Sequence, residues 1–319
     1  MLLMAPLELI CHEPMQLAIN FNSSPELAEI LKDLGYELNI TQLSNGFQQG
    51  SYLSNSSREG IISTQLSSSQ DLSIEGSRNP DFIPFITTSG PMLDHGKMMG
   101  KQSLFHFGRQ LKETSTIHYA GSIMSVLLIP YTSIKDNTSD NIIETINTKN
   151  EIFLEKTELS KFHNRTIRNL NSIDTCLEEW LIFLEELIEN SIDDNSNQKE
   201  ELEWEAAVKI SKLIYNDLPF KPIRIKDLCK LLFTSKNKVY ATCKSIFSLT
   251  PMQAIKCMRL EQTRRLLRSA SLREEMNLNS ILSIHTFYGF SNKRTFREQY
   301  LTLFGETPRE TLSRNIHIF

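Results

Sequence analysis

The sequence predicts an α+β protein in which a β-rich N-terminal domain precedes an all-α C-terminal domain. Three observations predict it: a length of 319 residues, a change from short punctuated apolar stretches to helical periodicity, and a separation of charge between the halves. A chain this long exceeds what one hydrophobic core usually organises, so two domains are expected. We place them at residues 1–192 and 202–319, with a linker at 193–201.

The N-terminal half is predicted to consist of strands followed by one helix. From about residue 38 to 134, Gly, Ser, Asn and Pro separate short apolar stretches such as YELNITQL, PDFIPFITTSGP and SIMSVLLIPYTSI, which indicates an antiparallel sheet of barrel-like or sandwich form. Segment 172–191 is predicted to be an amphipathic helix, because its apolar residues recur every three or four positions. These are Cys176, Trp180, Phe183, Leu184, Leu187 and Ile188.

The C-terminal half shows dense helical periodicity after the polar run DDNSNQKEE (193–201). We expect helices over about 202–215 and from Ile225, the latter interrupted at Thr234 and Ser235 before a second helix that Ser235 caps. Val239, Cys243 and Ile246 form the apolar face of that helix. A longer helix starts at Pro251. Two further helices follow, of which the first ends at Gly289 and the second begins at Ser291.

Two parts of this half are related by an internal repeat. SIFSLTP and TLFGETP align at an offset of 57 residues, which superimposes Phe247 on Phe304 and Pro251 on Pro308. The half therefore contains two helix-turn-helix units joined by one straight helix.

The charge distribution matches this division. Residues 205–319 contain 20 Lys and Arg against 9 Asp and Glu, a net charge of +11, whereas residues 1–204 contain 14 against 29, a net charge of −15. A basic module suits a polyanion, because each cation near a phosphate releases condensed counterions. Basic charge alone is a weak signal, but a doubled helix-turn-helix can also place two helices in successive major grooves of one DNA duplex.

The groove-facing residues are expected on the exposed sides of the second helices, near their N-termini. They are Lys236, Asn237, Tyr240 and Lys244 in the first unit and Asn292, Lys293, Arg294, Thr295, Glu298 and Gln299 in the second. Asn, Gln, Thr and Glu can read base edges, whereas Lys236, Lys244, Lys293 and Arg297 suit phosphates. The alternative is that these residues form only the solvated faces of small helices.

Residues 204–312 resemble the AraC/XylS family of bacterial regulators, through IKDLCKLLFTS, MRLEQTRRLL (258–267) and YGFSNKRTFREQYLTLFGETPRETL (288–312). The resemblance implies a transcription regulator, an activator rather than a repressor, with promoter DNA and RNA polymerase as partners and a small molecule as effector. It also implies that the residues approaching bases are Asn237, Tyr240 and Ala241 in the first unit and Thr295, Glu298 and Gln299 in the second. Ala241 could touch only a thymine methyl group.

The sequence departs from the family pattern at four positions. His285 stands where a small residue usually packs the two helices of the second unit together, so it must find a hydrogen-bond partner or splay them. Phe287 and Tyr288 make the same corner bulkier. Glu298 replaces a residue that is often basic, which predicts a distinct operator.

The competing interpretation is an enzyme or carrier built on the β-rich half. The sequence has no G-x-S-x-G, H-E-x-x-H, Walker or G-x-G-x-x-G motif, so we expect no catalytic activity and no cofactor. A cupin-like domain could bind a ligand through His95, His106 and His118, or line a pocket with Met92, Met98 and Met99. Ordinary packing is the commoner role of these residue types.

The cysteines and apolar runs indicate the compartment. The five cysteines are scattered without C-x-x-C spacing, which predicts neither a disulfide framework nor a zinc site. No apolar run reaches the length of about 18–20 residues that a bilayer requires, and the first residues lack the basic region of a signal peptide. We expect a cytoplasmic protein without membrane contact. Its oligomeric state stays open, because the helix at 172–191 could pair with its copy in a homodimer or cover the sheet.

Overall fold

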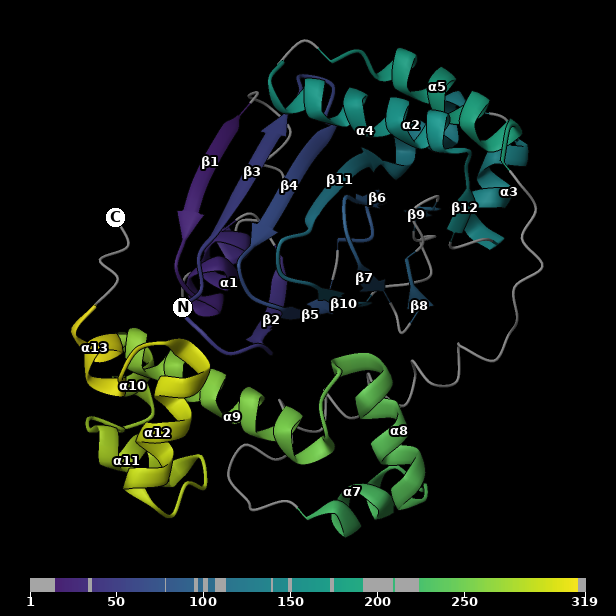
Figure 1. Cartoon of the computed structure of the whole chain (residues 1–319). Helices are drawn as coiled ribbons and strands as arrows, with labels where there is room; N and C mark the ends of the chain where they lie inside the picture. The colour runs from purple at the N-terminus through teal and green to yellow at the C-terminus, as the bar shows by residue number, and fades with distance from the viewer. Residues whose placement is uncertain are drawn as a thin grey trace.

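The computed structural model describes residues 15–33, 36–77, 79–94, 97–99, 103–106, 113–138, 140–148, 151–172, 175–191, 209 and 224–314. Two antiparallel sheets and their covering helices make up the N-terminal half, and the C-terminal half is helical (Figure 1), so the predicted fold class is confirmed. The predicted linker at 193–201 lies outside the described residues, as does the predicted helix at 202–215 apart from residue 209.

The strands form a seven-stranded and a five-stranded sheet. The first has the order β1 (Gln16–Phe21), β3 (Gly50–Ser56), β4 (Ile62–Ser68), β11 (Ile123–Pro130), β6 (Phe82–Thr88), β9 (Ser103–His106) and β12 (Glu151–Phe153). The second has the order β2 (Glu37–Gln42), β5 (Leu72–Ser77), β10 (Glu113–His118), β7 (Met92–Asp94) and β8 (Lys97–Met98). The apolar stretches predicted as strands are strands, whereas β1 and β12 lie outside the predicted range.

Helices cover one face of the seven-stranded sheet (Figure 1): α2 (Tyr131–Asn137), α3 (Asp140–Thr148), α4 (Lys156–Leu170) and α5 (Leu177–Glu189). Leu127 of β11 pairs with Phe85 of β6, and both join a buried cluster with Trp180 and Leu184 of α5. Trp180 is 1% exposed and meets Phe162 edge to face at 5.6 Å between ring centroids. The predicted amphipathic helix is confirmed over 177–189, whereas its predicted start at 172 is wrong, because Cys176 is the N-cap. Trp180 is a core residue.

A second cluster lies on the other side of this half. Phe21 packs there with Leu27 and Leu31 of α1 (Ser24–Asp33) and with Leu72 of β5. This helix precedes the segment in which the sequence analysis placed secondary structure. Its position matters because α1 and β2 both contact the C-terminal half.

The C-terminal half contains α7 (Ile225–Leu231), α8 (Lys236–Phe247), α9 (Pro251–Arg268), α10 (Ala270–Glu275), α11 (Ile281–Phe287), α12 (Lys293–Phe304) and α13 (Pro308–Ser313). The central helix α9 contacts α8 at one end, α10, α11 and α13 along its length, and α1 and β2 across the domain boundary. Its buried residues include Ile255, Met258 and Leu267. In the part of the chain that the structure describes, no helix is both long and apolar enough to span a bilayer.

Candidate nucleic-acid interface

The first helix-turn-helix unit consists of α7 and α8. Val239, Cys243 and Ile246 are buried in one cluster with Leu228 of α7, as their spacing predicts. Ser235 caps α8, because its Oγ accepts a hydrogen bond from the backbone nitrogen of Lys238 at 3.3 Å. The apolar face therefore fixes how α8 lies and turns its polar face outward.

The second unit consists of α11 and α12. Gly289, at φ +78°, ends α11, and Phe296 and Tyr300 are fully buried on the inner face of α12. The expected start of α12 at Ser291 is wrong by two residues, since the helix begins at Lys293 and Asn292 is its cap. Asn292 Oδ1 accepts a hydrogen bond from the backbone nitrogen of Thr295 at 3.0 Å. Asn and Ser are both good caps, so composition alone did not separate the two positions.

The helix ends confirm the internal repeat. Ser248 and Gly305, 57 positions apart, are the left-handed residues that end α8 and α12, with φ of +54° and +65°. Thr250 and Thr307 then form matching capping boxes with Gln253 and Glu310. Each box opens a helix whose first residue is proline. The two units are thus equivalent in three dimensions as well as in sequence.

The residues selected on α8 lie at its surface. Lys236, Asn237, Ala241 and Lys244 are exposed, and Tyr240 is 37% exposed. Lys236 Nζ lies 5.8 Å from the centroid of the Tyr240 ring, and Lys244 Nζ donates to the carbonyl of Ser248 at 3.1 Å. Both lysines remain on the outer face, where a phosphate could replace these weak contacts.

The residues selected on α12 are also outside, with one exception. Lys293, Arg294, Thr295, Arg297 and Glu298 are exposed, whereas Gln299 is half-buried. Arg294 Nε donates to Glu298 Oε1 at 2.9 Å across one helical turn. This exposed pair contributes little to stability. It does keep the guanidinium and the carboxylate next to each other on the outer face.

His285 finds a partner and does not splay the second unit. It is 3% exposed, and its Nδ1 lies 2.9 Å from the carbonyl oxygen of Phe290, to which it donates. Its ring lies 5.2 Å from that of Phe296 on α12, and the Phe290 amide donates back to the His285 carbonyl at 2.9 Å. A small residue at this position could not form the first of these hydrogen bonds, whereas the other ring nitrogen, Nε2, is buried without a partner among the described residues.

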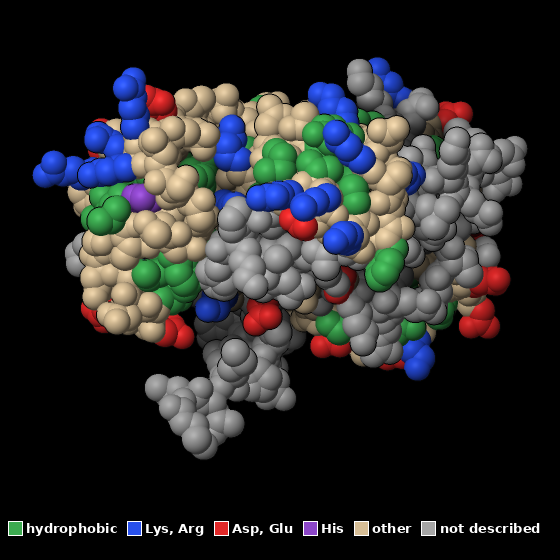
Figure 2. All heavy atoms as spheres, turned by 90° about the horizontal axis from the view of Figure 1, so that it is seen from below, with side chains coloured by type: hydrophobic (Ala, Val, Ile, Leu, Met, Phe, Trp, Pro, Cys, Tyr) green, Lys and Arg blue, Asp and Glu red, His purple; other side chains and the backbone are tan. Residues whose placement is uncertain are grey.

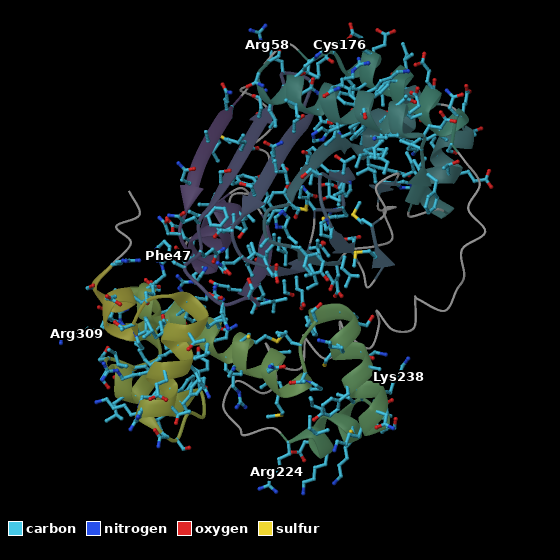
Figure 3. The ribbon with its side chains drawn as sticks, viewed as in Figure 1. Phe47, Arg58, Cys176, Arg224, Lys238 and Arg309 are labelled. Atoms are coloured by element: carbon cyan, nitrogen blue, oxygen red, sulfur yellow. The ribbon has the colours of Figure 1, made fainter. Side chains whose placement is uncertain are left out.

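Helices α8 and α12 lie near opposite ends of α9 (Figure 1). The 18 residues of α9 span about 27 Å at 1.5 Å per residue, close to the roughly 34 Å between successive major grooves on one side of a duplex. Figure 2 shows Lys and Arg side chains over both ends of this surface. Figure 3 labels further exposed cations that the sequence pattern did not indicate, among them Arg224 before α7 and Arg309 on α13.

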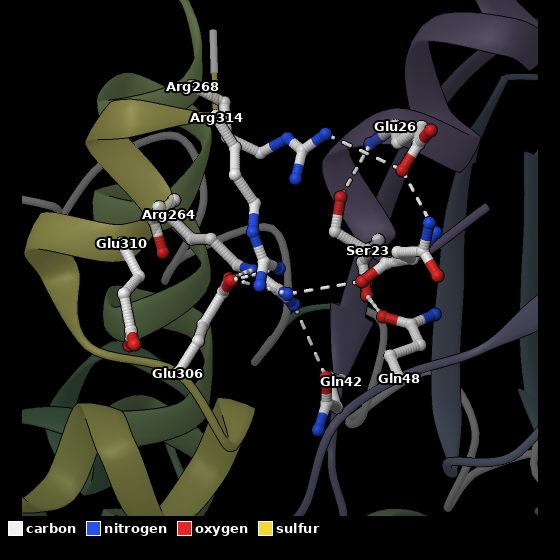
Figure 4. A network of polar contacts seen from close by, with 12 residues as sticks. Ser23, Glu26, Gln42, Gln48, Arg264, Arg268, Glu306, Glu310 and Arg314 are labelled. Atoms are coloured by element: carbon white, nitrogen blue, oxygen red, sulfur yellow. Dashed lines mark hydrogen bonds and ion pairs between the residues drawn. The ribbon is translucent and has the colours of Figure 1, made fainter. Parts of the chain in front are cut away.

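Polar contacts join this interface to the N-terminal half, with Arg264 of α9 at their centre (Figure 4). Arg264 is fully buried, and its Nε and Nη2 donate to Glu306 Oε1 at 3.1 and 2.9 Å. The same guanidinium donates to the carbonyl of Asn22 at 3.2 Å and to Gln42 Oε1 at 3.4 Å. One side chain therefore connects α9, the segment after α12 and two N-terminal segments.

Gln42, the last residue of β2, extends this network. Its Nε2 donates to the carbonyl of Leu303 in α12 at 2.6 Å, and its backbone nitrogen donates to Glu261 Oε2 at 2.9 Å. The Gly46 amide donates to the same Leu303 carbonyl at 3.0 Å. Burial raises the pKa of Glu261 to about 7, although Arg264 lowers it. Helix α12 is thus hydrogen-bonded directly to the β-sheet half.

The N-terminal histidines and methionines do not form one site. His106 lies on β9 and His118 on β10, strands of different sheets, and His95 lies outside the described residues. Burial lowers the pKa of His106 to about 3 and that of His118 to about 4. Met92 and Met99 are buried whereas Met98 is 53% exposed. Within the described ranges, no three His, Cys, Asp or Glu side chains are grouped to hold a metal ion.

The chain thus joins a β-sheet domain to a pair of helix-turn-helix units, the class of structure that places an α-helix in the major groove. Comparison with known proteins supports this class, because the family described as "Helix-turn-helix domain" matches residues 228–314. A curated relative, the XylDLEGF operon transcriptional activator 2 of Pseudomonas putida, is 31% identical over 93 residues. These residues are 29% of this chain and 57% of that protein, so the match spans little more than half of the relative.

Three solved structures are also similar. A probable AraC family transcriptional regulator from Rhodopseudomonas palustris has 26% identity and a TM-score of 0.30, and covers 34% of this chain and 96% of its own. The AraC-like transcriptional activator CuxR has 14% identity and a TM-score of 0.38, with 77% and 94% covered. ToxT from Vibrio cholerae has 12% identity and a TM-score of 0.31, with 96% and 99% covered.

Proposed function

We propose that the protein is a sequence-specific transcription regulator that binds promoter DNA through the outer faces of α8 and α12. The observation that supports this most strongly is the pair of exposed polar faces at the two ends of α9, each on the second helix of a helix-turn-helix unit. The helix that joins the two units, α9, is about 27 Å long, of the same order as the roughly 34 Å between successive major grooves on one side of a duplex. The net charge of +11 on residues 205–319 supplies the attraction for phosphates.

Within this interface we assign two kinds of contact. Asn237 and Thr295, both exposed near the N-termini of their helices, read base edges, together with Tyr240, Ala241, Glu298 and Gln299. The exposed cations Lys236, Lys244, Lys293 and Arg297 hold phosphates and set the register. Asn292 is occupied as a helix cap, which leaves its amide nitrogen for a phosphate or base.

The regulatory part of the proposal depends on the contact between the halves. A small molecule that binds the N-terminal half and alters β2 acts on α9 and α12 through Gln42 and Arg264. We further propose that the protein activates transcription with RNA polymerase in the cytoplasm, without enzymatic activity. Within the AraC/XylS family, LCKLL (228–232) and LFGETPRETL (303–312) are similar to the regulator of ethanolamine utilisation, which favours an amino alcohol or a cobalamin as effector.

Binding titrations of the full chain on matched and scrambled duplexes test the assignments. Asn237→Ala and Thr295→Ala should reduce the discrimination between the two duplexes, by about 1–3 kcal/mol each. Lys244→Ala, a matched change on the same helix as Asn237, should weaken binding to both duplexes about equally. If discrimination is the same in all three variants as in the parent protein, the base-reading roles are wrong.

A further inference from the structure

A surface cavity lies between α4 and α5, in the half of the molecule that carries no helix-turn-helix unit. Its volume is about 590 Å³, within the range of small-molecule sites. Cys176, on its rim, lies on the side of the molecule opposite α8 and α12 (Figure 3). The residues that line it come only from the N-terminal half.

The cavity is basic, although residues 1–204 carry a net charge of −15. Lys161, Arg165 and Arg168 follow one another along α4 at intervals of four and three residues, so they share one face of the helix. Glu179 of α5 is the one carboxylate in the lining, and it pairs with Arg165 at 3.1 Å. Among the described residues, no carboxylate lies within ion-pair distance of Arg168.

Arg165 is fixed over an aromatic wall. Its guanidinium carbon lies 5.0 Å from the ring centroid of Trp180 and 5.0 Å from that of Phe183, and its side chain is 30% exposed. The rings and Glu179 restrict the orientation of the guanidinium, so less side-chain conformational entropy is lost when a ligand binds. The cavity thus presents Arg165 held by Glu179, Lys161 paired with Glu158 at 2.7 Å on the same helix, and Arg168, which has no carboxylate partner among the described residues.

A buried donor completes the site. Asn169 lines the cavity and is 8% exposed, and its Nδ2 has no hydrogen-bond acceptor. By contrast, the backbone carbonyls at this end of α4 are occupied. The Asn169 carbonyl accepts from Asn55, that of Leu170 from Gln16, and that of Arg168 from the Asn171 amide. These three backbone carbonyls are therefore occupied, while the buried amide donor of Asn169 is not.

We propose that this cavity binds a small organic anion, a carboxylate or a phosphate ester, whose oxygens pair with Arg168, Lys161 and the amide of Asn169. The guanidinium of Arg165, which lies over the buried rings of Trp180 and Phe183, would contact the body of the ligand. The site does not depend on the proposed DNA-binding role, because α8, α9 and α12 contribute nothing to it.

Isothermal titration calorimetry of the full chain tests the proposal, with inorganic phosphate and succinate as separate probes that distinguish the two anion chemistries. At least one probe should bind. Arg168→Gln and Lys161→Gln should each weaken that binding about tenfold, the loss expected for one charge-assisted hydrogen bond. Both side chains are exposed, so neither change should unfold the protein.

Lys135→Gln is the matched control, since Lys135 is an exposed lysine at the end of α2 and does not line the cavity. It should leave the affinity unchanged. The proposal is overturned if neither probe binds, or if Arg168→Gln and Lys135→Gln have the same effect. DNA binding should be the same in all of these variants without added anion, so the result is separable from the proposed function.

Discussion

Removal of the buried cation at the domain boundary, Arg264→Met, should destabilise the protein by about 3 kcal/mol. Breaking a buried ion pair costs roughly 3–5 kcal/mol, because it leaves an uncompensated charge. Glu306 is 2% exposed and keeps a second partner, Arg314 at 2.8 Å, which places the cost at the lower end of that range. The carbonyl of Asn22 and Oε1 of Gln42 also lose a donor.

Urea unfolding of the full chain measures this change. Arg265→Met is the matched control, because Arg265 is exposed and adjacent in the same helix, and it should alter the unfolding free energy by no more than about 0.5 kcal/mol. A double-mutant cycle with Gln42→Leu should give a coupling energy of about 0.5–1 kcal/mol, since the two side chains are hydrogen-bonded across the boundary. Equal effects of the two arginine changes would refute the buried-pair argument.

Three further predictions concern local features. Phe233→Gly should stabilise the protein by about 0.5–1 kcal/mol in urea unfolding. Phe233 is 97% exposed and held at φ +48°, so the relief of left-handed backbone strain outweighs the added flexibility of the unfolded chain. A loss of stability would mean that the phenyl ring makes a stabilising contact. Thr307→Ala should cost about 1 kcal/mol by removing the cap of α13, and Thr250→Ala should cost a similar amount at α9; circular dichroism melts compare them, and a neutral result for both would contradict the capping role. The buried His106, with its pKa lowered to about 3, stays neutral in the folded state while the unfolded chain takes up a proton below about pH 6.5, so stability should fall as pH drops from 6.5 towards 3. His106→Leu should flatten this decline in unfolding measurements across that range, and an unchanged slope would show that His106 is not responsible.

The helices of the two units could be predicted because periodicity and capping are local signals. Val239, Cys243 and Ile246 mark one face by spacing alone, and that face is buried. The start of α12 was misplaced because Ser291 and Asn292 are adjacent residues with similar capping ability. The role of His285 is set by a local hydrogen bond, from its Nδ1 to the carbonyl of Phe290 in the following turn, which the spacing of apolar residues does not specify.

The contact between the two halves could not be predicted from the sequence. Gln42 and Arg264 are 222 positions apart, and neither belongs to a sequence motif that predicts their contact. The cations of α4 show helical spacing in the sequence, but only the fold places them beside Trp180 and the buried amide of Asn169. Polar networks of this kind depend on which surfaces meet, and hydrophobic patterning does not specify that.

Selection of binding sites from randomised duplex DNA by the full chain shows whether α8 and α12 read one duplex together. We expect an enriched site with two short elements about one helical turn, roughly 10 base pairs, apart. Asn237→Ala should relax only one element and Thr295→Ala only the other. A single uninterrupted element, or no enrichment at all, would contradict the claim.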